Sequence, residues 1–147
     1  LQLLEDLMVS RQTDVDAVLD FIPVPDGRLS SGFGRRTDPI TGRFSMHNGL
    51  DFAAPRGTPI YAVGAGVVTF AARNGAYGNM VEINHGNGLK TRYAHANELK
   101  VSKGDLVQKG QEVATVGNTG RSTGAHLHLE VYRNGMAVNP RRFLALN

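Results

Sequence analysis

The sequence HLHLEVY at residues 126–132 alternates polar and apolar side chains, and it decides the fold class. Successive side chains of a β-strand point to opposite faces, so the alternation predicts a strand with Leu127 and Leu129 on its core face. His126 and His128 then share the other face, where two imidazoles can reach one small site. Such a pair also arises by chance, so other parts of the chain have to support a functional interpretation.

Further strands are predicted by runs rich in Val, Ile, Thr and Tyr, at residues 63–70, 80–84, 89–95 and 113–117. Few helical patterns interrupt these runs, although a short helical turn is expected near residues 141–144. We therefore predict a mainly β fold, an antiparallel β-sheet domain with a central active-site groove, spanning residues 26–147.

The connections between these strands carry turn signals. Asn-Gly pairs accept a positive φ at both central turn positions and suit tight hairpins; they occur at residues 74–75, 87–88 and 134–135. The Lys-Gly steps at residues 103–105 and 109–111 are each expected to form a turn that leads into a strand.

Residues 1–25 differ from the rest of the chain. Their leucines lie near helical spacing, and Pro23 and Pro25 end helical structure. We interpret this range as a helical segment and linker, and we expect an upstream coiled-coil or membrane-anchor domain in the full-length protein. The alternative is that this helix packs on the β domain.

The composition narrows the chemistry. Hydrophobic residues make up 41% of the 147-residue chain and charged residues 20%, which allows a core and argues against disorder. No run of 18 apolar residues occurs, so we expect no membrane span. Cysteine is absent, so a metal site has to be built from imidazole and carboxylate groups.

The charge is uneven along the chain. Residues 1–20 hold five acids and one base, so with a net charge of +3 the remaining residues carry +7. A basic body attracts polyanions, either nucleic acid or an anionic cell-wall polymer. The aromatic content of 7%, the absence of Trp and the scattered Arg and Lys argue against nucleic acid.

A second motif, HNGLD at residues 47–51, places His47 four residues before Asp51. Gly49 makes a helix unfavourable here, and in an extended chain the even spacing puts both side chains on one side. One imidazole and one carboxylate form part of a zinc shell. His95, at the end of a predicted strand, could bring a third imidazole, whereas His85 precedes a turn and is expected to be exposed.

These motifs together resemble the lysostaphin-type, LytM-like zinc metallopeptidases, which are peptidoglycan endopeptidases. The resemblance covers residues 27–144. Beyond the histidines and Asp51, it is carried by SGFGRR at residues 31–36, GLDFA at 49–53, GTPIYA at 57–62, YGN at 77–79 and GRSTG at 120–124.

The resemblance implies a role for each motif residue. His47, Asp51 and His128 would bind Zn2+, and three protein ligands leave a fourth position open for water, as catalysis requires. His126 and His95 would flank the metal without being obligatory ligands. We assign His126 as the general base and His95 as the group that steadies the developing oxyanion, although the two roles can be swapped or shared.

Three other polar residues have weaker claims to a role. Tyr93 precedes His95 by two positions and would share its face, so it lines the groove or packs as a core aromatic. Asn79 contacts the substrate or forms a turn. Glu130 continues the face of His128, where it orients that imidazole or faces solvent.

The resemblance predicts an enzyme that hydrolyses peptide stems or cross-bridges of peptidoglycan in the periplasm or outside the cell. The groove is expected between the loops at residues 33–46 and 73–79. The alternative is a non-catalytic module that binds the wall and activates another hydrolase, which would have lost metal ligands. A third possibility is a structural β domain with incidental histidines.

Overall fold

The computed structural model describes residues 19–37, 41–120, 122 and 124–144. Nearly all regular structure in this part of the chain is β, as the sequence predicted, while the expected helix within residues 1–25 falls largely on residues that the structure does not describe. The first six strands are β1 (Arg28–Ser31), β2 (Gly34–Thr37), β3 (Phe44–His47), β4 (Leu50–Ala53), β5 (Pro59–Tyr61) and β6 (Gly66–Arg73).

The second half continues the same architecture. Its strands are β7 (Asn79–Gly86), β8 (Leu89–Leu99), β9 (Leu106–Val107), β10 (Glu112–Val116), β11 (His126–Arg133) and β12 (Met136–Val138). Two short 3-10 turns accompany them, η2 (Gly75–Tyr77) and η3 (Pro140–Arg142). None of the helices described is long and apolar enough to cross a membrane.

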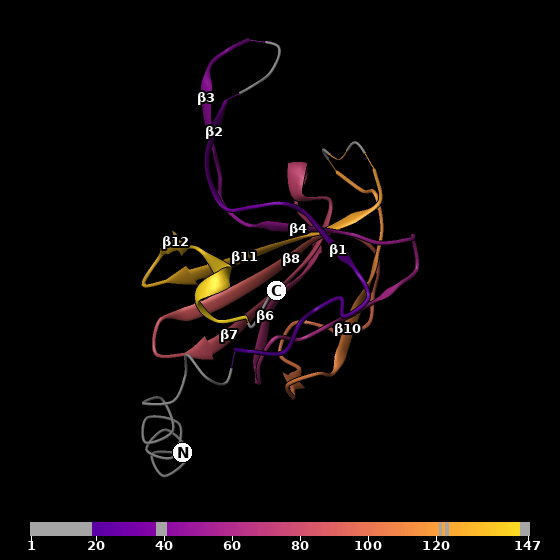
Figure 1. Ribbon diagram of the computed structural model, residues 1–147. Coiled ribbons are helices and arrows are strands. Elements are labelled where there is room, and N and C mark those ends of the chain that lie inside the picture. The colour runs from indigo at the N-terminus through magenta and orange to yellow at the C-terminus, as the bar shows by residue number, and fades with distance from the viewer. Residues whose placement is uncertain (1–18, 38–40, 121, 123, 145–147) are drawn as a thin grey trace.

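Ten of the strands in the described part of the chain form one antiparallel sheet, in which seven follow the order β1-β4-β11-β8-β7-β6-β9, and β2 and β3 form a separate two-stranded sheet (Figure 1). Strand β10 pairs with β5 and β8, and β12 pairs with β11. Strand β11 therefore lies near the middle, between β4 and β8. This central position brings the HLH motif beside the strand that carries Asp51.

Two of the three Asn-Gly pairs form the predicted hairpins. Asn87 and Gly88 both have positive φ and join β7 to β8, and the pair at 134–135 joins β11 to β12 in the same way. The prediction of a tight turn at Asn74-Gly75 was wrong, because Asn74 has a negative φ of −141° and precedes the 3-10 turn η2. The longer connection places Tyr77 beside the candidate site.

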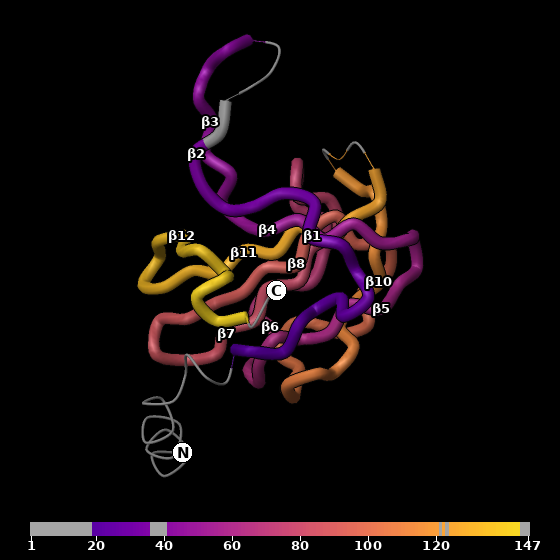
Figure 2. The backbone as a smooth tube through the Cα atoms, viewed as in Figure 1, coloured from indigo at the N-terminus to yellow at the C-terminus, as the bar shows by residue number. Residues whose placement is uncertain are grey.

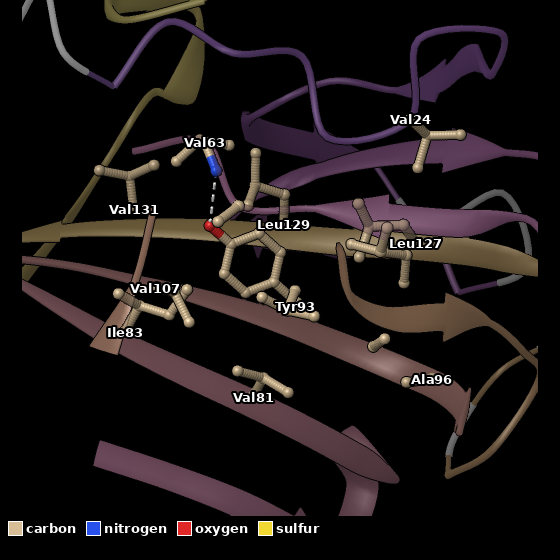
Figure 3. Packing of buried hydrophobic residues seen from close by; sticks show 14 of the residues in the cluster. Val24, Val63, Val81, Ile83, Tyr93, Ala96, Val107, Leu127, Leu129 and Val131 are labelled. Carbon is tan, nitrogen blue, oxygen red and sulfur yellow. Dashed lines mark hydrogen bonds between the residues drawn. The ribbon is translucent and has the colours of Figure 1, made fainter. Parts of the chain in front are cut away.

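The face of β11 opposite His126 and His128 packs into the core. Leu127 and Leu129 are fully buried, and they belong to one core cluster with Tyr93 and with Val81 of β7 (Figure 3). The tyrosine hydroxyl accepts a hydrogen bond from the amide of Val63 at 3.0 Å. A regular strand with one apolar face explains this packing.

Part of the N-terminal range packs on this core. Leu19 and Val24 are fully buried, and Phe21 contacts the ring of Tyr61 edge-on with centroids 5.9 Å apart. The backbone of Phe21 also donates to the carbonyl of Val63. Residues 19–24 thus belong to the packed body, while the boundary that we placed at residue 25 stays a prediction.

The β2–β3 hairpin projects away from the sheet (Figures 1 and 2). Phe44 and Met46 are 67% and 54% exposed on it, and the guanidinium of Arg35 lies over the Phe44 ring at 4.3 Å. The hairpin ends at His47, so its base forms part of the candidate site.

His85 corrects a prediction. It is buried within β7 rather than exposed in a turn, with Nδ1 2.7 Å from the Ala65 carbonyl and Nε2 2.8 Å from the Thr91 hydroxyl. The Thr91 hydroxyl in turn lies 2.9 Å from that of Tyr93. Because a carbonyl only accepts, Nδ1 carries the proton of the neutral ring and Nε2 accepts from Thr91. Burial lowers the pKa of His85 to about 4, against the effect of the Ala65 bond.

Candidate metal centre and active site

Three side chains from three strands converge at one point. His47 ends β3, Asp51 lies in β4, and His128 lies in β11 directly opposite Asp51 in the antiparallel register. The Nε2 atom of His47 is 3.1 Å from Asp51 Oδ2, and Nδ1 of His128 is 2.8 Å from Asp51 Oδ1. One ligand atom from each residue lies within 4.8 Å of the others.

The convergence depends on a glycine that sequence reasoning treated only as a helix breaker. A Cβ at Gly49 would collide with the carbonyl oxygen of Leu129 and lie 3.0 Å from the His128 ring. Strands β3 and β4 meet here without forming one continuous strand, so close backbone approach, rather than even spacing, brings His47 to Asp51.

His47 is fixed by the backbone. Its Nδ1 lies 2.6 Å from the carbonyl oxygen of Gly32, which can only accept, so this nitrogen carries the ring proton. The lone pair of the neutral imidazole is therefore on Nε2, the atom that faces Asp51. A hydrogen bond of this kind fixes both the tautomer and the ring orientation of a metal ligand.

His128 has a carboxylate behind it instead of a carbonyl. Its Nε2 lies 2.8 Å from Glu130 Oε2, while Nδ1 faces Asp51. Burial lowers the pKa of His128, but the hydrogen bonds to Asp51 and Glu130 outweigh burial and raise the pKa to about 9. Burial raises the pKa of Asp51, yet the bond to His128 and the nearby imidazoles bring it below its usual value.

The two predicted catalytic histidines lie beside this triad. His126 Nδ1 is 2.8 Å from the Gly124 carbonyl, and its Nε2 is 3.7 Å from Asp51. His95 Nδ1 is 2.7 Å from the Thr119 carbonyl. Both neutral rings therefore carry the proton on Nδ1 and leave Nε2 as an acceptor. Their ring centroids are 4.9 Å apart, so the structure brings all five predicted residues together.

A β-bulge turns His95 into the site. Strand β8 pairs Tyr93 with Val81 and Ala96 with Asn79, which leaves an extra residue on β8, and His95 has φ of 63°. This break in the alternation puts Tyr93 in the core and His95 in the site, so our expectation of a shared face was wrong. A non-glycine residue in this conformation is strained, as is common at functional sites.

Two cavities adjoin the five site residues. A cavity of about 170 Å³ is lined by Ala76, Tyr77, His95 and His128. A second cavity of about 210 Å³ is lined by Ser30, Asp51, Ala53, Gly124, Ala125 and His126. The two cavities share no lining residue, and each is lined by two of the five site residues.

Two weaker candidates have structural partners. The side-chain amide of Asn79 donates to the carbonyls of Ala96 and Asn97, so it holds strand ends together. Glu130 is 3% exposed and contacts His128, so it does not face solvent. Tyr77 lies in the loop at residues 73–79 that we expected to wall the groove, but its contact with Glu130 was not predicted.

The donor set suits zinc. Two imidazole nitrogens and one carboxylate oxygen match a catalytic zinc shell, and each imidazole is oriented by an internal acceptor. A family model described as peptidase family M23 matches residues 45–140, a range that contains all five site residues. The chain belongs to peptidase family M23. The resemblance inferred from the motifs is thereby confirmed.

The M23 chain is similar to several named proteins. It is 48% identical over 118 residues to "DD-carboxypeptidase/endopeptidase Mpg" of Neisseria meningitidis, covering 80% of this chain and 27% of that protein. It is 49% identical over 113 residues to "Peptidoglycan DD-endopeptidase ShyA" of Vibrio cholerae, covering 76% and 26%. The chain thus spans about a quarter of the length of these curated relatives.

Solved M23-like structures have the same fold. A zinc-containing peptidase from Vibrio cholerae superposes with a TM-score of 0.77 and 41% identity, covering 83% of this chain and 38% of that one. The catalytic domain of the antimicrobial peptidase lysostaphin from Staphylococcus simulans gives 0.73 and 30%, covering 82% and 93%. The antiparallel β architecture is therefore that of the M23 domain.

Proposed function

We propose that residues 26–147 form the catalytic domain of a zinc-dependent endopeptidase that hydrolyses peptide cross-links of bacterial peptidoglycan. The observation that carries this proposal is the convergence of His47, Asp51 and His128, with one ligand atom of each within 4.8 Å of the others. Membership of family M23 and similarity to proteins named peptidoglycan endopeptidases support the substrate class.

His47 Nε2, His128 Nδ1 and a carboxylate oxygen of Asp51 would hold the metal. Zinc bound there would polarise the scissile carbonyl and lower the pKa of water, so that a nucleophile is available near neutral pH. The chain's own contribution is orientation, because the Gly32 carbonyl and the Glu130 carboxylate each fix one ligand ring.

His126 is proposed as the general base. Its Nδ1–H donates to Gly124, so Nε2 holds a lone pair 3.7 Å from Asp51 and can take a proton from the nucleophile. His95 is proposed to steady the developing oxyanion by donating a hydrogen bond from Nε2, which requires the doubly protonated ring. Burial lowers the pKa of His95, so the negative charge of the oxyanion has to stabilise that proton. With centroids 4.9 Å apart, the two rings can exchange these roles.

The bond is proposed to be a D,D-cross-link rather than a glycine bridge. Support comes from 46–49% identity to proteins named peptidoglycan DD-endopeptidases. The two cavities that adjoin the site are proposed to hold the two halves of the cross-link. With such a substrate, the domain is proposed to act in the periplasm or outside the cell. We also propose that the full-length protein has an upstream coiled-coil or membrane-anchor region.

Digestion of purified peptidoglycan tests the function. The zinc-loaded chain is expected to release soluble muropeptides, to stop when a chelator removes the metal, and to resume when zinc is restored. A zinc-loaded, folded chain that leaves cross-links intact would contradict the proposal. The alternative, a wall-binding activator that has lost metal ligands, predicts no turnover and stimulation of a second hydrolase. This chain retains His47, Asp51 and His128, the three proposed ligands.

A further inference from the structure

Glu130 is a buried carboxylate that contacts a proposed ligand. Its Oε2 lies 2.8 Å from Nε2 of His128, and its side chain is 4% exposed. Its Oε1 accepts hydrogen bonds from the hydroxyls of Tyr132 at 2.8 Å and Tyr77 at 3.1 Å. A carboxylate removed from water at this cost needs strong partners, and the imidazole is the nearest group that can carry a charge.

Arg92, the cation opposite Glu130 in the sheet, does not by itself balance the buried charge of Glu130. The register places Glu130 opposite Arg92, and Arg92 opposite Glu82, in one row across β11, β8 and β7. Arg92 is 2.8 Å from Glu82 but 3.8 Å from Glu130. The arginine therefore pairs mainly with Glu82, and Glu130 is directed to His128.

We propose that Glu130 is a positioning residue for the metal centre, where its carboxylate holds Nε2–H of His128 and presents Nδ1 of that ring to zinc. The inference rests on the proposed zinc site. It concerns a residue outside the ligand and base set, and it explains why His128, unlike His47, His95 and His126, is oriented by a charged group.

His128 needs an orienting carboxylate because of the ring nitrogen that it presents to the metal. His47 presents Nε2, whereas His128 presents Nδ1, the nitrogen nearer its own backbone. A neutral ring with the proton on Nδ1, or a ring turned over, would offer no lone pair at that point. The negative Glu130 favours the proton on Nε2 and increases the basicity of the ring as a ligand. Tyr77 and Tyr132 fix the carboxylate that does this.

The test compares Glu130→Gln with Glu82→Gln. Both changes remove one negative charge from the same row of side chains, but only Glu130 contacts His128. Zinc affinity is measured by competition with a chromogenic chelator, and the ligand field by the visible spectrum of the Co2+ form. Glu130→Gln is expected to lower zinc affinity roughly 10–100-fold and to alter the cobalt spectrum. Glu82→Gln is expected to leave both near the wild-type result.

Thermal unfolding of the metal-free variants separates this role from general destabilisation. If Glu130→Gln is not folded, Glu130→Asp keeps the charge but shortens its reach to Nε2, and it too should weaken zinc binding. Wild-type affinity in a folded Glu130 variant, or an equal loss in Glu82→Gln, would overturn the positioning role. A folded wild-type chain that binds no zinc would instead overturn the zinc site and this inference together.

Discussion

Two histidines of the main sheet have opposite properties: His85 of β7, which is buried, and His128 of β11, which is part-buried. His85 and His128 are each hydrogen-bonded through both ring nitrogens, at distances between 2.7 and 2.8 Å. The pKa of His85 falls to about 4 because burial dominates and its partners are a carbonyl and a hydroxyl. The pKa of His128 rises to about 9 because the two carboxylates outweigh burial.

The difference shows that the charge of the partners decides which of the two rings is held neutral and which is held as a cation. His85 completes a neutral chain of hydrogen bonds through Thr91 to Tyr93, inside the sheet. His128 lies between two anions, Asp51 and Glu130, where a cation is stabilised. A divalent metal next to Asp51 uses the same negative field.

The largest effect is expected from His128→Ala. The loss of one of three ligands should abolish detectable zinc binding and reduce hydrolysis of cross-links by roughly 1,000-fold or more, which is about 4 kcal/mol of transition-state stabilisation. Zinc content per folded chain and release of muropeptides measure the two effects. The matched control is His85→Gln, which should still bind zinc; normal zinc content in His128→Ala would refute the ligand assignment.

His126→Ala should separate metal binding from turnover. This ring is oriented by the Gly124 carbonyl and is proposed as the base, so its removal is expected to slow hydrolysis about 10²–10⁴-fold. Zinc affinity should change far less than in His128→Ala. Chelator competition and the rate of cross-link cleavage on one protein preparation make the comparison, and a fully active variant would show that the base lies elsewhere.

The third prediction concerns pH. Because the folded pKa of His85 is about 4 and the ordinary value is 6.5, the unfolded chain binds more protons between these values. The stability that His85 contributes is therefore complete above pH 6.5 and is lost as the pH falls towards 4, by roughly 3 kcal/mol. Urea unfolding of the metal-free chain at pH 7.5 and pH 4 measures the loss.

The variant His85→Gln isolates that contribution. Other groups titrate in both proteins, so the informative quantity is the difference between their losses of stability over the same pH interval. The wild-type chain should lose more than the variant. Equal losses would show that His85 is not held neutral by the sheet.

Tyr93→Phe should have the smallest effect of the four. The change removes the hydroxyl that accepts from the Val63 amide and contacts Thr91, and leaves these buried groups without that partner. The free energy of unfolding should fall by about 1–3 kcal/mol. Zinc affinity should stay unchanged since Tyr93 faces the core, and a selective loss of zinc would instead connect the two regions.

The sheet was predictable from local pattern. Alternation in residues 126–132 placed Leu127 and Leu129 in the core, and the Asn-Gly pairs at 87–88 and 134–135 gave two hairpins. These features depend on neighbouring residues only. The mainly β fold was therefore confirmed, together with membership of the family.

The errors share a different cause. Whether His85 is exposed depends on Ala65 and Thr91, which meet it only after the strands pair. The side of the sheet to which Tyr93 points depends on the β-bulge at His95, and no residue type in this part of the sequence predicts that bulge.

The site was predictable in its residue types but not in its geometry. Nothing in the sequence indicates that carbonyls of Gly32, Thr119 and Gly124 orient three of the imidazoles, because every residue has a carbonyl. Glu130 was indicated by its period-2 relation to His128, but its burial was not. The structure brings the five site residues together, while their catalytic roles stay predictions.

The central claim is that His47, Asp51 and His128 hold one zinc ion. Anomalous X-ray diffraction at the zinc absorption edge, on crystals of the zinc-loaded chain, tests it most directly. The account predicts one peak about 2.0–2.2 Å from His47 Nε2, His128 Nδ1 and an Asp51 oxygen. No peak, or a peak away from these atoms, would contradict it.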